Sequence, residues 1–339
     1  MPIPSFLGSP RQFLFAAPSI VLGLWAFKMV GEVSGPAFEP IIAVCGDPAI
    51  PPDEFATRTG YHSYEPLVGL GAFKILVCLI TQFLLELRET HPAGMITWCG
   101  LMLTGLPFGV LATIEAGRAG ARGPVRYPVL MGLAYQLLGI SVVVPLLWVP
   151  SYIYGAGDGA VSAARSYASI PISLPGLLLT AAVFTANTDG QLWTTCAGIL
   201  GGPGLPLAAG LLWRLTPPLT KTKDALTKSA DAAAFAYRAV APVAFLGYAC
   251  LVYITYTEYG VDGAALWGAV WSGAGPSVAF MTIDAIVLYV AVCLYIAFRD
   301  VGGAIKAVAL TPVVGPGAAI AIVMAALEEE PFALASKRD

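Results

Sequence analysis

Residues 276–298 read PSVAFMTIDAIVLYVAVCLYIAF, and this stretch decides the fold class. It is long enough to cross a bilayer, which takes about 20 mostly apolar residues, and its one charged side chain is Asp284. Lipid offers no water to backbone N–H and C=O groups, so a crossing segment of this kind must be helical. The stretch therefore predicts a transmembrane helix with a carboxyl group inside it.

Similar apolar runs recur along the chain. They cover residues 12–33, 64–87, 93–116, 127–149, 169–188, 191–213, 232–257 and 302–327. The last run contains Pro312 and several glycines, so it can be broken or re-entrant rather than a full crossing. We therefore expect an all-α fold, a polytopic bundle of eight or nine membrane segments that forms a single integral membrane domain over residues 1–339.

The composition supports this class. Of 339 residues, 57% are hydrophobic and 12% are charged, whereas soluble domains carry roughly 25% charged residues. A net charge of -3 argues against a nucleic-acid partner, because phosphate backbones are bound by clustered Lys and Arg. With two histidines and no Cys/His cluster in the sequence, we expect neither a metal nor another cofactor.

Two connections stand out by their charge. Residues 34–63 are acidic and rich in proline, and we expect them to cap the non-cytoplasmic face. Residues 214–231 carry Arg214, Lys221, Lys223 and Lys228, and the Lys/Arg bias of short loops predicts that this loop is cytoplasmic, with the N-terminus. Arg118, Arg122 and Arg126 conflict with this orientation, because strictly alternating helices place them on the other side.

Carboxylates near helix ends are the main functional signal. In an alternating topology one membrane face collects Glu32, Glu65, Glu115, Asp189 and Glu258. Asp284 lies about two turns from that face, with apolar sequence on both sides. Charged groups inside a membrane cost free energy and are often functional, so Asp284 and Glu65 are the first catalytic candidates. Glu115, Glu32 and Asp189 follow, and each is also explained as an interfacial acid that meets water.

Aromatic side chains gather near the same predicted face. The candidates for substrate binding are Trp25, Tyr64, Phe108, Trp193, Tyr253, Tyr256 and Phe280. An interfacial belt of Trp and Tyr explains such a distribution. The alternative is a pocket whose ring faces stabilise a cation.

The chemistry that these residues allow is narrow. The sequence has no paired Asp-rich motif, no GxSxG elbow, no P-loop and no dinucleotide fingerprint, which argues against prenyl transfer, serine hydrolysis and nucleotide chemistry. An apolar environment disfavours the charged form of a carboxylic acid. A buried Asp or Glu can therefore stay protonated, act as a general acid and turn an epoxide or alkene into a carbocation. The same acids would also suit a proton-coupled transporter.

Three segments resemble a known family. HSYEPLVGLGAFK (62–74), LPFGVLATIEAGR (106–118) and FTANTDGQLWTTCAG (184–198) are similar to the membrane-bound terpene cyclases of fungal meroterpenoid pathways, the ascochlorin and ascofuranone cyclase family with its macrophorin-type cyclase. The resemblance implies metal-free, acid-triggered cyclisation of a farnesyl-type chain on an aromatic or polyketide head group, in the endoplasmic reticulum membrane. No catalytic position is taken from it.

These observations leave three hypotheses. The first is a metal-independent terpene cyclase, an isomerase whose partners are a lipophilic prenylated substrate and membrane lipid. The second is a proton- or ion-coupled transporter of small molecules that uses the intramembrane carboxylates. The third is a structural membrane subunit, in which the acids would be scattered and exposed to water.

Overall fold

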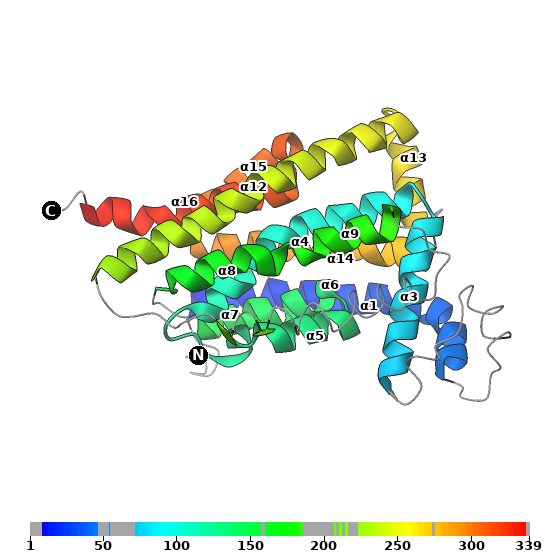
Figure 1. Ribbon diagram of the computed structural model, residues 1–339, viewed down its shortest axis with the longest axis horizontal. Coiled ribbons are helices and arrows are strands. Elements are labelled where there is room, and N and C mark those ends of the chain that lie inside the picture. Colours follow the sequence, from blue (N-terminus) through cyan, green and yellow to red (C-terminus); the bar gives the residue numbers. More distant parts are fainter. Residues whose placement is uncertain are drawn as a thin grey trace.

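The computed structural model describes residues 9–46, 54, 72–156, 160–185, 207, 210–211, 214–215, 223–272 and 275–336. Within these ranges the chain is helical and contains no β-strand. Figure 1 shows most of the long helices lying along the longest axis of the molecule. The expected all-α class is confirmed.

The longer helices are α1 (Pro10–Gly46), α3 (Ala72–Glu89), α4 (Ala93–Gly117), α5 (Pro128–Leu138), α8 (Ala163–Ser173), α9 (Pro175–Thr185), α12 (Lys223–Tyr259), α14 (Pro276–Arg299), α15 (Val301–Val314) and α16 (Pro316–Ser336). The shorter ones are η3 (Gly123–Arg126), α6 (Ile140–Val143), η4 (Val144–Trp148), α7 (Val149–Gly155), α13 (Gly263–Trp267) and η6 (Gly268–Ser272).

Short polar side chains begin several of these helices. Ser162 accepts a hydrogen bond from the Arg165 N–H at the start of α8, at 3.2 Å. Asp262 does the same for α13 and Asp300 for α15. Such caps satisfy N–H groups that the first turn leaves unpaired.

Long-range contacts fix the direction of each long helix. Arg11, at the start of α1, donates to the Phe298 carbonyl oxygen at the end of α14. Glu115, at the end of α4, lies 3.6 Å from Arg299 in the last turn of α14. Charged side chains gather at this end of the bundle, and we call it the cluster end. We call the opposite end, where α14 begins, the α3 end. The helices α4 and α14 therefore run in parallel toward the cluster end, and α1 runs away from it.

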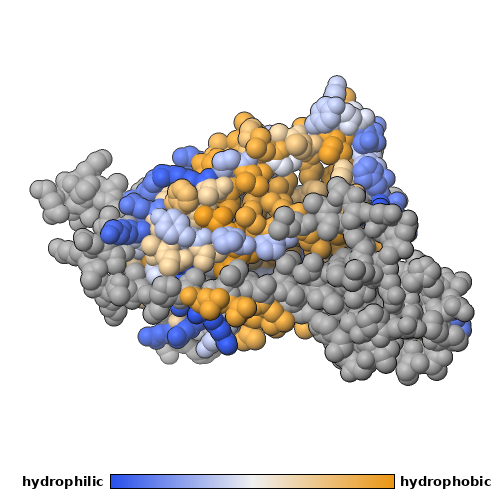
Figure 2. Space-filling view, in the orientation of Figure 1, coloured by the Kyte–Doolittle hydropathy of each residue, from blue (hydrophilic) through white to orange (hydrophobic). Residues whose placement is uncertain are grey.

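Within the described ranges, four helices are long and apolar enough to cross a membrane. The candidate spans are Pro10–Pro36, Ala93–Gly117, Lys228–Tyr259 and Pro276–Arg299. In the first and third, 22% and 11% of the most apolar window is buried, against 67% and 61% in the other two. Figure 2 shows apolar surface over the middle of the molecule, with hydrophilic residues toward its ends. Apolar surface of this extent is expected to face lipid. The expected total of eight or nine membrane segments stays a prediction.

The expected crossing at 64–87 is replaced by a different arrangement over its described part. Figure 1 shows α3 running across the end of the bundle rather than along it. Its last turn contacts the start of α14, where the Ser277 hydroxyl donates to Glu86 Oε2 at 2.6 Å. Because α3 lies across this end of the bundle and does not cross back, α4 runs directly to the end where α1 began. The Arg118 side chain therefore lies at the same end as Arg11, which removes the conflict in the charge distribution.

The expected crossing at 127–149 is wrong, because this segment is a hairpin. The helix α5 ends at Leu138, too short to span, and Gly139 reverses the chain with a φ of 86°. The chain returns through α6, η4 and α7. The Arg122 N–H donates to the Gly155 carbonyl oxygen at 2.8 Å, so the hairpin begins and ends on the same side.

The apolar run at 302–327 is broken, as its glycines and proline suggest. Gly315 has a φ of 83° and separates α15 from α16, and these two helices pack against each other. The connection 34–63 begins as helix, because α1 continues to Gly46, and the loop 214–231 gives way to α12 at Lys223. Most of the remainder of these two connections lies outside the described residues.

Candidate functional site

A cavity of about 530 Å³ lies toward the α3 end of the bundle. Its walls come from α1, α3, α4, the tip of the α5–α6 hairpin, α9 and α14. Its volume is in the range of small-molecule pockets, ~300–1,000 Å³. Most of the lining is aliphatic or aromatic, and Asp284 is the charged residue among the described side chains that line it. We call it the Asp284 cavity.

The tip of the hairpin positions Asp284. This side chain is 3% exposed, and its Oδ1 accepts a hydrogen bond from the Ser141 N–H at 3.0 Å. Gly139 allows this approach, because a β-carbon there would lie 3.3 Å from the same Oδ1 and 3.0 Å from Phe280 Cζ. Within the described part of the chain Asp284 makes no ion pair. A carboxyl group held among neutral groups in an apolar cavity is suited to carry a proton.

Aromatic rings form part of the cavity wall. Phe83 and Phe280 meet edge to face, with ring centroids 5.5 Å apart. Trp98 also lines the cavity, and its Nε1–H donates to Thr180 Oγ1 at 2.8 Å, which fixes the indole. The ring of Tyr135 completes this set. Ring faces of this kind can stabilise a positive charge that forms beside them.

A buried stack of rings connects this wall to the cluster end. Phe108 lies behind Tyr135, with centroids 6.0 Å apart, and packs edge to face on Trp148 at 5.3 Å. Trp148 contacts Tyr152 and Tyr295, and the last two rings are 4.5 Å apart. Phe108, Trp148 and Tyr295 are at most 3% exposed. Packed side chains therefore fill the space between the cavity and the cluster end.

Beyond the stack lie two buried acids, Glu115 and Glu328, and two part-buried arginines, Arg118 and Arg299. We call these four residues the ion cluster. Arg118 pairs with Glu115 at 2.8 Å and with Glu328 at 2.6 Å. Arg299 pairs with Glu328 at 2.9 Å and contacts the Tyr295 hydroxyl at 3.1 Å. The Tyr295 hydroxyl donates to Glu115 at 3.0 Å. Two cations and two anions balance, and together they join the ends of α4, α14 and α16.

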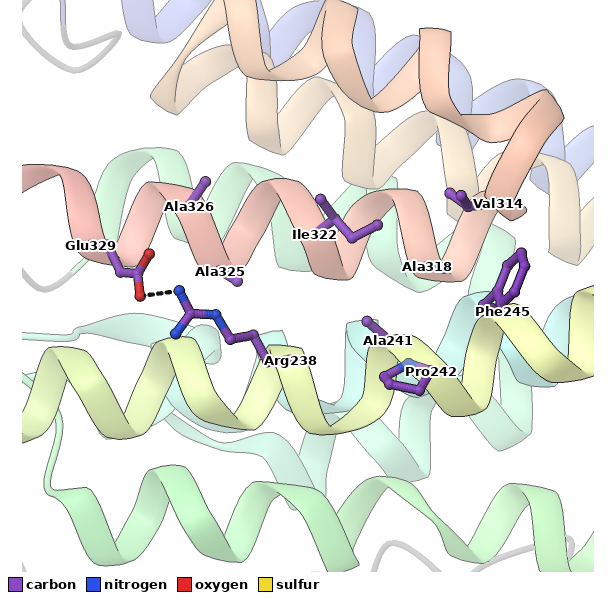
Figure 3. A pocket seen from close by; sticks show the side chains of 10 residues that line it. All are labelled: Arg238, Ala241, Pro242, Phe245, Val314, Ala318, Ile322, Ala325, Ala326 and Glu329. Carbon is purple, nitrogen blue, oxygen red and sulfur yellow. Dashed lines mark hydrogen bonds and ion pairs between the residues drawn. The ribbon is translucent and has the colours of Figure 1, made fainter.

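A second hollow, of about 540 Å³, lies between α12 and α16. Figure 3 shows Arg238 and Glu329 joined between the two helices at one end of the hollow, with Ala241, Ile322 and Phe245 along its length. Its two charged side chains pair with each other and are 58% and 41% exposed. This hollow is an apolar groove on the outside of the bundle, and it offers no reactive group.

The structure separates the predicted site residues. Asp284 and Phe280 line the cavity, and Phe108 lies one layer behind it. Trp25, Tyr253 and Tyr256 are between 45% and 68% exposed and do not line it. Glu32 pairs on the surface with Lys28 at 3.7 Å. Four of the predicted residues lie outside the described part of the chain: Glu65, Tyr64, Asp189 and Trp193.

The expectation that Glu115 shares a membrane face with Asp284 is wrong. Glu115 pairs with Arg299, which follows Asp284 by about four helical turns. The error comes from counting 127–149, which lies between these two helices in the chain, as a crossing, because this count inverts the direction of α14 relative to α4. Glu32 pairs instead with Lys28, which lies one turn earlier in α1.

Sequence reasoning missed Trp98, Tyr135 and Phe83, and three members of the ion cluster. All three aromatic residues fall inside segments that the sequence predicts as helices, so they could have been included among the aromatic candidates. The basic residues Arg118 and Arg299 looked like interfacial charges at helix ends. Their acidic partner Glu328 lies far from both in the sequence, so spacing alone did not reveal the cluster.

Metal ligation has no candidate in the described ranges, where no three His, Cys, Asp or Glu side chains gather closely enough to hold an ion. The absence of a cofactor stays a prediction. Comparison with known proteins adds no identification, because no family model, no curated protein and no solved structure matches this chain.

Proposed function

We propose that the chain is a membrane enzyme that uses the Asp284 carboxyl as a general acid on a lipophilic substrate, and specifically a metal-independent terpene cyclase. One observation carries this proposal: a buried carboxyl group without an ion-pair partner among the described residues lines an apolar cavity with aromatic walls. The sequence resemblance to fungal meroterpenoid cyclases supports the same reaction class. General acids of this kind need a proton held next to the reacting atom and shielded from water.

The reaction would proceed without a change in mass. Asp284 gives its proton to an epoxide oxygen or to an alkene carbon of a farnesyl-type chain. As the epoxide C–O bond breaks, or as the protonated alkene becomes a cation, the π electrons of the next alkene form a carbon–carbon bond. Phe83, Phe280 and Trp98 stabilise the positive charge through their ring faces. A carboxylate takes up the last proton, and Glu65, outside the described residues, stays our candidate for that role.

Glu115 is a poor candidate for proton donation. It contacts Arg118 and Arg299 and accepts a hydrogen bond from Tyr295. Both of its carboxyl oxygens are therefore engaged inside the ion cluster. We assign Glu115 to the ion cluster, which joins helix ends.

The membrane setting follows from the same proposal. The bundle would contain the four candidate spans and further membrane segments among the other apolar runs of the sequence, with hairpin α5–α7 entering and leaving on one side. The cluster end carries Arg11, Arg118 and Arg299, so the Lys/Arg bias places it toward the cytoplasm. We expect the endoplasmic reticulum membrane, where a prenylated substrate can reach the protein through lipid.

A second function, proton- or ion-coupled transport, has one observation in its favour. The hairpin tip meets the carboxyl group inside the bundle, where the Ser141 N–H contacts Asp284, and helices broken at such sites are common in transporters. Transport also needs a route to both faces. The ring stack and the ion cluster occupy the described path from the cavity to the cluster end, which favours the enzyme.

The decisive experiment measures conversion of a farnesylated phenol with a terminal epoxide by microsomes that contain the full chain. We expect a cyclised product of unchanged mass from the wild type, and loss of that product in Asp284→Asn. Glu258→Gln serves as the control, because Glu258 is exposed at the end of α12, and its product level should equal that of the wild type. Glu65→Gln tests the proposed proton acceptor.

If the Asp284→Asn variant accumulates to the normal level and still forms the product, the assignment of Asp284 is overturned. The absence of any isomeric product from both the epoxide and the corresponding alkene would reject the cyclase and favour transport. Proton uptake by reconstituted vesicles would then be measured.

A further inference from the structure

Two hydroxyl groups beside the Asp284 cavity have no hydrogen-bond partner among the described residues. The side chains of Ser34 and Tyr135 both line this cavity, and their oxygens are shielded from water without a partner in the described residues. Ser34 is 4% exposed, on α1, and Tyr135 lies in the last turn of α5. Among the described buried polar atoms without a partner, these are the ones whose residues line the cavity.

A buried hydroxyl group without a partner costs free energy, so each case needs a physical explanation. Ser and Tyr hydroxyls each offer one donor and accept as well. Rotation about χ1 of Ser34, or about the C–O bond of Tyr135, redirects these groups at little cost. A ligand oxygen in the cavity would satisfy them. Among the other described residues of the lining, Trp98, Gln136 and Asp284 carry polar side-chain atoms, and the Trp98 N–H already donates to Thr180.

We propose that the Asp284 cavity binds an amphipathic ligand whose polar head carries a hydroxyl or carbonyl oxygen, and that the hydroxyls of Ser34 and Tyr135 bind this head. The inference rests on the proposed function and specifies its substrate class. The head lies against α1 and α5, and the hydrocarbon chain fills the part lined by aliphatic and aromatic residues of α3 and α4. Anchoring the head in this way leaves the hydrocarbon chain to reach Asp284 on α14.

The test is a pair of ligands that differ by one oxygen, 2-farnesylphenol and farnesylbenzene. Equilibrium binding of both tritiated compounds is measured on the purified full chain in detergent. We expect the wild type to prefer the phenol by about 2- to 10-fold for each hydrogen bond. Ser34→Ala combined with Tyr135→Phe should bring this ratio close to one and leave the affinity for farnesylbenzene unchanged.

A matched control and a stability readout separate binding from folding. Tyr167→Phe also removes one tyrosine hydroxyl, from an exposed side chain on α8, and should keep the wild-type ratio. Without ligand, the double variant should melt at the wild-type temperature or above it, because it removes buried groups that have no partner. A lower melting temperature would show that the hydroxyls have a structural role and would overturn the inference.

The outcome is separable from that of the cyclase proposal. Binding needs no turnover, so a phenol preference that disappears in the double variant supports the inference even if no cyclised product forms. An unchanged preference in the double variant, or equal binding of both ligands by the wild type, overturns it even if the wild type cyclises the epoxide.

Discussion

Gly139 has a φ of 86°, and a β-carbon built there would lie 3.0 Å from Phe280 Cζ and 3.3 Å from Asp284 Oδ1. We predict that Gly139→Ala lowers the free energy of unfolding by about 1–3 kcal/mol, because this backbone region is rarely adopted by residues other than glycine. It should also move the Asp284 carboxyl away from the Ser141 N–H, so product formation falls more than stability explains. Thermal unfolding in detergent and microsomal conversion measure the two effects.

Gly123→Ala is the matched control at the residue scale. Gly123 also has a positive φ, of 68°, but a β-carbon there would meet nothing within 4 Å. It should therefore lose stability through the backbone alone and keep its conversion rate for the same amount of folded protein. Equal losses of conversion in the two variants would contradict the proposed role of the hairpin tip.

The sequence selects Asp284 as a candidate through a physical argument that needs only one residue. A carboxyl group with apolar residues on both sides is costly in a membrane, so its position needs no partner to be informative. The aromatic candidates had no such constraint. Trp25 and Tyr253 lie on the exterior. In a membrane protein an apolar side chain is stable both against lipid and in the core, so its type does not predict which way it faces.

At the scale of helices, the neighbouring residues Glu328 and Glu329 of α16 can be compared directly, because the first belongs to the ion cluster and the second to the exposed ion pair between α12 and α16. Glu328 is 6% exposed and shared by Arg118 and Arg299, whereas the Glu329 side chain is 41% exposed and pairs with Arg238. We predict that Glu328→Gln costs about 3–5 kcal/mol, because it leaves Arg118 and Arg299 to share the single carboxylate of Glu115. Glu329→Gln should cost less than about 1 kcal/mol.

Denaturant unfolding of both variants in the same detergent tests this difference. Similar losses of stability would show that water reaches the ion cluster and that it does not hold α4, α14 and α16 together. The sequence could not rank these two glutamates, because burial at neighbouring positions depends on which face of α16 meets the bundle.

The presence of helices could be predicted from the length of the apolar runs. The direction in which each helix runs through the bundle could not. The run at 127–149 has the length of a crossing but turns back at Gly139, where a positive φ is needed. The run at 64–87 is apolar, and its described part crosses the end of the bundle in Figure 1. Hydropathy measures compatibility with an apolar environment, which both a re-entrant hairpin and a helix across the bundle end share with a spanning helix.

For the whole molecule, these two elements decide which loops share a side of the membrane. The charge conflict in the sequence arose because alternating helices placed Arg118 opposite Arg11, whereas in the structure both lie at the cluster end. A distribution that gathers basic side chains at one end agrees with the Lys/Arg bias of membrane proteins. The charge pattern was therefore the more reliable guide, and the crossing count was the part to revise.

Side-specific labelling tests this topology. Ser9, Pro124 and Val261 are exposed, and Val261 follows the far end of α12. Each is replaced by cysteine in a variant whose native cysteines are alanine, and sealed microsomes are treated with a membrane-impermeant maleimide. We expect Ser9→Cys and Pro124→Cys to react from the cytoplasmic side, and Val261→Cys only after the vesicles are opened. Reaction of Pro124→Cys together with Val261→Cys would restore the alternating topology and, with it, a single membrane face for Glu115 and Asp284.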